Sequence, residues 1–133
     1  MDLYFEGYLD GPPTRSLEEI MRCAGWRPVK AEGGWTVFEV DSDIPLLRRA
    51  YLKVRERGPW SFEGEGYALG SRLEFSLDLS RSGDRVRWIF RGRQSGLVDL
   101  LGRGFVEAVA RSLADRLAKC CRADLLPSGV NNP

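Results

Sequence analysis

The chain of 133 residues contains no histidine, and this absence excludes several kinds of active site. Histidine is the commonest general base and metal ligand near neutral pH. A Ser-His-Asp triad, a Cys-His pair and a zinc site with histidine ligands are therefore impossible. Any catalysis would depend on carboxylate, tyrosine, cysteine or lysine side chains.

Cysteine is also scarce, and the three present, Cys23, Cys120 and Cys121, do not make a disulfide framework. Adjacent cysteines on a helix point about 100° apart, so Cys120 and Cys121 cannot easily bond to each other. We therefore expect small buried thiols. Structural zinc, which usually takes four Cys or His ligands, is the less favoured alternative. The sequence predicts no metal site and no cofactor.

Long hydrophobic runs are missing too. No stretch approaches the ~18 consecutive apolar residues that would cross a bilayer, so we predict no membrane insertion. Residues 1–6 include two acidic residues and no apolar core of a signal peptide, which favours a cytoplasmic location. The length and the ordinary hydrophobic content predict a single domain over residues 1–126, followed by a disordered tail at 127–133.

The net charge is only +1, so the chain as a whole has no field that would attract nucleic acid. Residues 85–93 nevertheless hold four arginines, which alternate with Trp88 and Phe90. The alternation places these aromatic side chains opposite the arginines, in the core, where they cannot stack on bases. It favours a solvated basic face over an anionic partner, and nucleic-acid binding is not expected.

Local patterns predict mostly strands, with one short helix near the start. Residues 3–9 form an aromatic-rich strand, and Ser16 with Glu19 matches a capping box that opens a helix through Cys23. From residue 29 to residue 93 the signals are those of antiparallel strands, clearest at 72–79 and 85–91, where apolar and polar residues alternate. Gly64 and Gly66 indicate a bend or a bulge.

After Gly92 the apolar period changes from two residues to 3.6, which predicts a long helix from about residue 97 to residue 123. Gly102 and Gly104 are expected to interrupt its first turns. The helix would carry one apolar stripe, formed by Leu97, Leu101, Phe105, Ala108, Val109, Leu113, Leu117, Cys120 and Cys121.

The order of a strand, a short helix, about six antiparallel strands and a long last helix resembles the helix-grip fold of the START (SRPBCC) superfamily. Its members include the birch-pollen-allergen family, bacterial polyketide cyclases and the G-subunit family of carbon monoxide dehydrogenase. The likeness covers residues 2–123, including the stretch 64–71 that enters an alternating strand. With no room for a second helix between Gly25 and Val29, the chain is similar to compact, archaeal members. The resemblance implies an α+β fold, in which a curved sheet of six to seven strands wraps around the last helix.

The resemblance also implies a cavity between sheet and helix for an apolar molecule such as a sterol, a lipid or a polyketide. The inward faces that would line it, from the strand and helix patterns, are Phe38, Leu52, Val54, Trp60, Phe62, Phe75, Leu77, Trp88, Phe90, Leu97, Leu101, Phe105 and Val109. Aromatic and aliphatic walls suit an apolar ligand. A closed core would need the same residues, so structural packing is the alternative.

Glu39, Glu56 and Tyr67, with Tyr8 as a lesser candidate, are the possible polar contacts of such a ligand. A carboxylate that faces an apolar cavity would have a raised pKa. The leading hypothesis is therefore a binding or carrier protein for a small hydrophobic molecule, acting as a monomer or a homodimer. The alternatives are a cyclase or hydrolase that uses these carboxylates or a tyrosine, and an interaction module with a basic outer face.

Overall fold

The computed structural model describes residues 1–40, 50–68 and 70–122. The predicted tail at 127–133 and the domain boundary at 126 lie outside these residues. The elements, in chain order, are β1 (Asp2–Leu9), α1 (Leu17–Cys23), β2 (Trp26–Glu32), β3 (Trp35–Val40), β4 (Tyr51–Gly58), β5 (Ser61–Ala68), β6 (Ser71–Ser82), β7 (Arg85–Gly96), the 3-10 helix η2 (Leu97–Leu101) and α2 (Arg103–Lys119).

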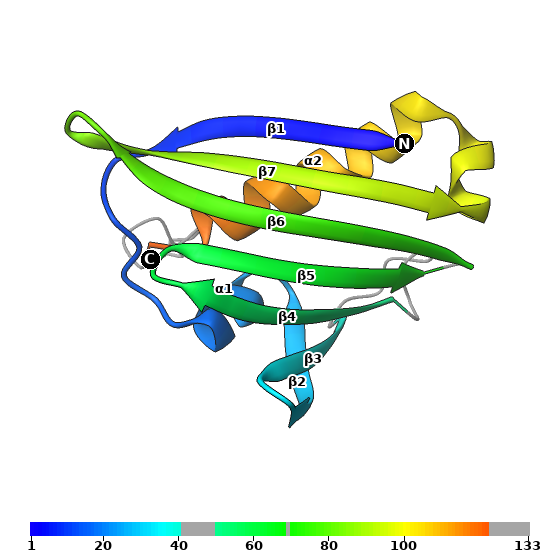
Figure 1. Cartoon of the computed structure of the whole chain (residues 1–133), viewed down its shortest axis with the longest axis horizontal. Coiled ribbons are helices and arrows are strands. Elements are labelled where there is room, and N and C mark those ends of the chain that lie inside the picture. Colours follow the sequence, from blue (N-terminus) through cyan, green and yellow to red (C-terminus); the bar gives the residue numbers. More distant parts are fainter. Residues whose placement is uncertain (41–49, 69, 123–133) are drawn as a thin grey trace, which may run out of the picture.

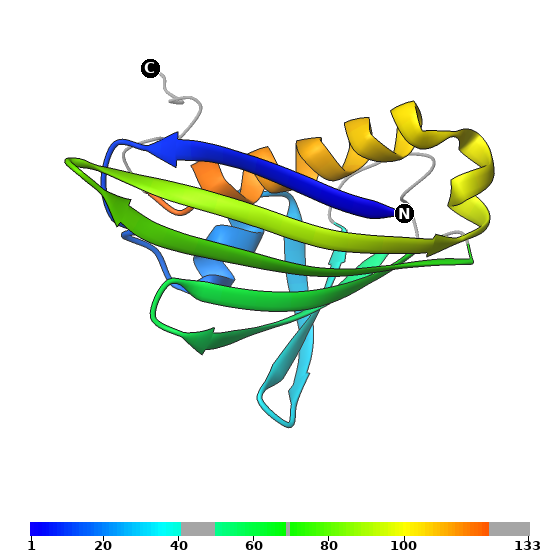
Figure 2. The same ribbon diagram turned by 45° about the horizontal axis from the view of Figure 1, so that its top comes forward.

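The strands form one antiparallel sheet in the order β1-β7-β6-β5-β4-β3-β2. The sheet curls, and α2 lies along one of its faces beside β1 and β7 (Figures 1 and 2). The α1 helix covers the part of the sheet near β2 (Figure 1). The predicted α+β helix-grip architecture is confirmed, with seven strands in the described part of the chain.

The predicted capping box opens α1. Glu19 N donates to Ser16 Oγ at 3.3 Å, and Ser16 N donates to Glu19 Oε1 at 2.9 Å, which satisfies two backbone donors that a helix start leaves free. Ile20 and Met21 are buried, so α1 is held on the sheet by its apolar side.

The alternation of β6 and β7 builds the centre of the core. Phe75, Leu77 and Leu79 on β6, with Val86, Trp88 and Phe90 on β7, are all buried. The rings of Phe75 and Phe90 stack with their centroids 5.4 Å apart. This face of the sheet is the one that α1 and α2 cover, as the period-two pattern predicts.

Gly64 and Gly66 make no bulge, contrary to the sequence-based expectation. The pairing of β5 with β6 is regular along its whole length, and β4–β5 shifts register between Glu56 and Gly58. The two glycines instead make room for neighbouring side chains. A Cβ at Gly64 would lie 2.5 Å from Phe75 Cζ, and a Cβ at Gly66 would lie 2.8 Å from Leu52 Cδ2.

The last helical region is broken where the sequence predicts an interruption. Gly102 has a φ of +93°, which favours glycine, and it separates η2 from α2. The buried side of α2 is formed by Val106, Ala110, Ala114, Leu117 and Ala118. None of the helices in the described part of the chain is long and apolar enough to cross a membrane.

Cys23 and Cys120 form a disulfide, so the expectation of three free thiols is wrong for these two residues. The residues are 97 positions apart, and only the packing of α1 beside the end of α2 brings their Cα atoms to 5.7 Å. A local sequence pattern does not contain that contact. Cys121 is a free buried thiol, as expected, and its Sγ donates to Leu117 O at 3.2 Å.

Candidate functional site

A cavity of about 490 Å³ lies between α2 and the end of the sheet where β4 and β6 begin and β5 and β7 end. It is a substantial volume, within the range of roughly 300–1,000 Å³ that is typical of small-molecule sites. The described residues that line it are Ala24, Gly25, Trp26, Val40, Ala50, Tyr51, Leu52, Gly66, Tyr67, Ala68, Ser71, Leu73, Gln94, Val98, Phe105, Ala108, Val109, Ser112, Leu113 and Arg116.

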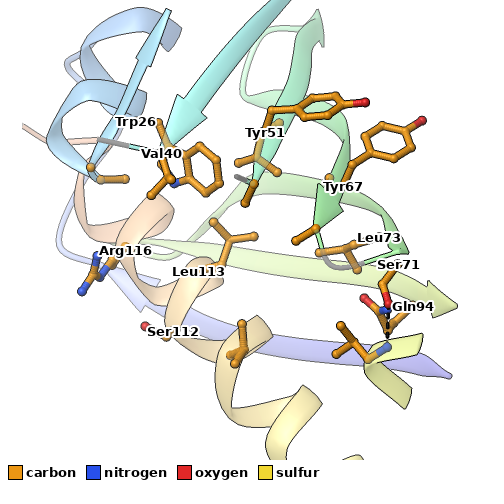
Figure 3. A pocket seen from close by; sticks show the side chains of 18 of the residues that line it. Trp26, Val40, Tyr51, Tyr67, Ser71, Leu73, Gln94, Ser112, Leu113 and Arg116 are labelled. Atoms are coloured by element: carbon orange, nitrogen blue, oxygen red, sulfur yellow. Dashed lines mark hydrogen bonds between the residues drawn. The ribbon is translucent and has the colours of Figure 1, made fainter. Parts of the chain in front are cut away.

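The wall is mostly apolar, and it is supplied by elements far apart in the sequence. Trp26 and Val40 come from β2 and β3, and Leu73 comes from β6 (Figure 3). Leu113 projects from α2 toward them (Figure 3). Gly66 adds no side chain, and so lets Leu52 lie close against the sheet. Such a surface favours an apolar ligand, which gains free energy by leaving water.

Polar side chains lie at the margins of this wall. Ser71 and Gln94 lie together at one end, and Ser112 and Arg116 lie at the other (Figure 3). Ser71 and Gln94 are each 8% exposed, whereas Arg116 is exposed. The polar side chains of the wall are therefore buried at one end and exposed at the other.

Tyr51 and Tyr67 form the rim beside β4 and β5. Their rings stack across the two strands with centroids 4.9 Å apart. The Tyr67 hydroxyl donates to Glu65 Oε1 at 2.7 Å, and Arg72 pairs with the same carboxylate at 3.0 Å. The hydrogen bond from Tyr67, followed by that from Arg72, lowers the pKa of Glu65. The hydrogen bond between Tyr67 and Glu65 also raises the pKa of Tyr67. The Tyr67 hydroxyl is therefore a poor proton donor and serves to fix the rim.

Of the thirteen predicted apolar lining residues, Leu52, Phe105 and Val109 line this cavity, as does Tyr67 from the polar group. The other ten lie elsewhere. Val54, Phe62, Phe75 and Leu77 surround a void of only about 10 Å³, which is closed by α1 and by Leu117 and Cys121. Phe38, Trp88 and Phe90 are buried in the core, Trp60 is half-buried, and Leu97 and Leu101 are 64% and 52% exposed.

The predicted carboxylates are outside the cavity. Glu39 is exposed on β3 and pairs with Arg27 at 2.9 Å. Glu56 is exposed beside the register shift at the end of β4, which removes it from the inward side that Leu52 and Val54 share. Tyr8 is also exposed, with the Arg85 guanidinium 4.2 Å from its ring centroid.

Ser71 and Gln94 were not predicted as site residues, although the sequence contains a signal for them. Ser71 has the parity of Leu73 and Phe75, and Gln94 has the parity of Trp88 and Phe90, so both fall on inward positions. A polar residue at an inward position marks a place where the core is interrupted. The signal is weak because the clear alternation covers only 72–79 and 85–91, whereas β6 begins at Ser71 and β7 continues to Gly96.

The basic outer face of β7 is occupied by contacts within the chain. Trp88 and Phe90 are buried, as predicted, but two exposed tyrosines of β1 share the face with the arginines. Arg85 stacks on Tyr8, Arg91 lies 5.5 Å from the ring centroid of Tyr4, and Arg87 pairs with Glu6 at 2.6 Å. Within residues 1–40, 50–68 and 70–122, no group of three or more Cys, Asp or Glu side chains is placed to hold a metal ion.

Residues 29–126 match the CoxG family, described as the G-subunit of carbon monoxide dehydrogenase. That span is most of the chain and includes nearly every residue that lines the cavity. No curated protein matches the sequence significantly.

Several solved structures share the fold at low sequence identity. A conserved protein from Geobacillus kaustophilus is 12% identical, with a TM-score of 0.65 over 96% of this chain and 97% of that one. A protein from Thermus thermophilus is 12% identical, with a TM-score of 0.57 over 98% and 100%. CalU16 from Micromonospora echinospora is 14% identical, with a TM-score of 0.57 over 95% and 79%. These similarities concern the fold alone.

Proposed function

Because the chain belongs to the CoxG family of carbon monoxide dehydrogenase, we propose that it binds a small hydrophobic molecule between the sheet and α2 and carries it. The observation that carries the proposal is the apolar cavity of about 490 Å³. A core that serves packing alone is normally filled throughout, since protein interiors leave few voids larger than a water molecule. It is closed where α1 lies, around the void of about 10 Å³, and it is open at the other end.

The proposal assigns a binding role and no reaction. Glu39 and Glu56, the carboxylates that an acid–base mechanism would use, are exposed and do not line the cavity. Two tyrosines line it, and Tyr67, the one predicted as a polar contact, already donates its hydroxyl hydrogen to Glu65. The polar groups that remain are suited to hydrogen bonding with a ligand.

The size of the site gives an expected affinity. A ligand that buries roughly 400 Å² of apolar surface gains about 10 kcal/mol at 25 cal/mol per Å². Association costs at least about 4 kcal/mol, so we expect a net gain of at most about 6 kcal/mol and a dissociation constant on the order of tens of micromolar or weaker. A screen at ligand concentrations of roughly hundreds of micromolar, above this dissociation constant, would therefore detect the binding.

Native mass spectrometry of freshly purified protein, followed by a binding screen of lipids and sterols, tests the proposal. We expect either a co-purified molecule or saturable one-to-one binding of at least one apolar compound. A protein that carries nothing and binds no member of the screen at concentrations well above the expected dissociation constant would overturn it.

We propose that the protein acts in the cytoplasm. The Cys23–Cys120 disulfide is an argument against this location, since disulfides persist mainly in oxidising compartments. Unfolding the protein in the presence of a thiol-blocking reagent at the moment of cell lysis, and then counting the blocked cysteines, tests this location. Three blocked cysteines would support a reducing compartment, and one would count against it.

A further inference from the structure

Ser71 and Gln94 are the only buried polar residues in the part of the chain that the structure describes, and both line the cavity. A buried polar group is costly unless it is hydrogen-bonded. Each of the two makes one hydrogen bond within the chain, and the capacity that remains at this end of the cavity is open to a ligand. Their positions on β6 and β7 bring them together (Figure 3).

The hydrogen bonds of Gln94 use one half of its side-chain amide. Nε2 donates to Ser95 O at 3.0 Å, which fixes the orientation of the amide. Its Oε1 accepts no hydrogen bond from any described residue. Among the described residues, Asp99 Oδ1 is the one fully buried side-chain oxygen or nitrogen without a partner, so Gln94 Oε1 is an accessible acceptor.

The hydroxyl of Ser71 accepts a hydrogen bond within the chain, and its own hydrogen is left free to donate. Its Oγ accepts from Val98 N at 2.6 Å, so the hydroxyl hydrogen is available for an acceptor, and no described residue supplies one. The backbone of Gly96 packs closely against Ser71. A Cβ added to Gly96 would lie 3.0 Å from Ser71 Oγ and 2.6 Å from Gly70 O. The donor is therefore pre-organised by the backbone around it.

We propose that Ser71 and Gln94 form a polar subsite that binds a hydroxyl group at one end of an otherwise apolar ligand. The inference rests on the proposed binding function. A hydroxyl is the small group that donates and accepts at once. It donates to Gln94 Oε1 and accepts from the Ser71 hydroxyl, so all three groups are satisfied together.

Other head groups satisfy the subsite less well. A carboxylate cannot donate, and it would place a negative charge against Gln94 Oε1. An ether oxygen accepts from Ser71 but leaves Gln94 without a donor. A hydrocarbon leaves both groups unsatisfied, which costs more than an ordinary hydrogen bond contributes.

The remaining polar side chains of the cavity do not duplicate the subsite. The hydroxyls of Tyr51 and Tyr67 point away from the other lining residues, and so does the Arg116 guanidinium (Figure 3). Arg116 is the cationic group that an anionic ligand would reach, so an anionic competitor tests Arg116 separately from Ser71 and Gln94.

The test is competition against aminoanthracene, a neutral fluorescent probe of apolar cavities, by dodecanol, dodecyl methyl ether and dodecanoate. We expect dodecanol to compete about tenfold more strongly than the ether, which lacks the donor. In Gln94→Leu, the alcohol and the ether should compete equally for whatever probe binding the variant shows. Ser71→Ala should also reduce the difference, and Ser112→Ala, a serine at the other end of the cavity, should leave it intact.

The outcomes separate the two proposals. If neither aminoanthracene nor any competitor binds the wild-type protein, the proposed function fails. If aminoanthracene binds but alcohol and ether compete equally in the wild type, the subsite is overturned and the binding function stands. Preference for dodecanoate that is lost in Arg116→Leu would also overturn the subsite. Should Gln94→Leu not fold, the wild-type ratio and the Ser71→Ala and Ser112→Ala pair decide the question.

Discussion

Cys23 and Cys120 join the end of α1 to the residue that follows α2, through a disulfide that closes 97 residues of sequence. Both ends of the bond lie next to the cavity. Ala24, Gly25 and Trp26 directly follow Cys23, and Arg116 lies one helical turn before Cys120. The bond therefore ties together two walls of the proposed binding site.

Reduction of this disulfide is expected to lower the free energy of unfolding by about 2 to 5 kcal/mol, because the unfolded chain regains the freedom that the long loop denies it. Urea unfolding with and without a reductant measures the effect. Cys23→Ser and Cys120→Ser should show the lowered stability without reductant and no further change with it. Cys121→Ala should keep the full reductant-dependent difference, and a loss of that difference in Cys121→Ala would contradict the assigned pairing.

The Cys121 thiol is expected to make the stability fall at alkaline pH. Burial raises its pKa from 9.0 to about 12, so the folded protein holds a proton that the unfolded chain releases between these values. Since the folded state binds more protons in this window, the free energy of unfolding decreases as pH rises through it. Urea unfolding at about pH 8 and about pH 10.5 should show a smaller decrease for Cys121→Ala than for the wild type.

The same burial makes a matching prediction for thiol labelling. At about pH 8 the folded protein should react very slowly with a thiol reagent, because the thiolate of Cys121 is scarce and inaccessible. Unfolding in urea should expose this one thiol, and reduction should expose Cys23 and Cys120 as well. Fast labelling of the native protein would mean that this thiol is not buried as described.

Leu113→Trp is expected to abolish or strongly weaken the binding of aminoanthracene, because Leu113 projects into the cavity and a larger ring would occupy it (Figure 3). Leu101→Trp is the matched control. Leu101 is 52% exposed on η2 and does not line the cavity, so the same exchange there should leave binding within about twofold of the wild type. Equal losses in the two variants, measured by fluorescence titration, would show that the probe binds elsewhere.

Gly64→Ala is expected to be more destabilising than Gly66→Ala. The new Cβ at residue 64 meets the ring of Phe75, which is itself stacked on Phe90, so the neighbours cannot give way, and a loss of about 1 to 3 kcal/mol is expected. At residue 66 it meets a terminal methyl group of Leu52, which can move into the cavity. Thermal or urea unfolding of the two variants gives the comparison, and a larger loss for Gly66→Ala would contradict this account of the packing.

Much of the fold can be predicted from the sequence because its signals are local. The alternation around Leu77 and Trp88 identifies β6 and β7, Ser16 and Glu19 mark the start of α1, and Gly102 marks the break before α2. These features depend on neighbours within a few residues along the chain. The family resemblance then gives the arrangement of sheet and last helix, and the structure confirms it.

The location of the cavity could not be predicted, since it depends on which end of the sheet α1 covers. Val54, Phe62, Phe75 and Leu77 share one side of the sheet with Leu52, but α1 packs against the first four. Leu97 and Leu101 fit the helical period, yet the chain forms η2 there and leaves them exposed. The Cys23–Cys120 disulfide could not be predicted for the same reason, because a local sequence pattern does not record a contact between distant helix ends.

The contrast between the two ends of the sheet has a consequence for how such a protein can change over generations. The core is closed where α1, Phe75 and Leu77 pack together, and the proposed ligand contacts lie around Leu113 and Leu73 in the cavity. Substitutions in the cavity wall that touch neither α1 nor the Cys23–Cys120 disulfide are expected to affect the closed end little, because sites without shared partners contribute almost independently. On the proposed function, one scaffold can therefore acquire new ligand preferences by mutation while the closed part of its core stays unchanged.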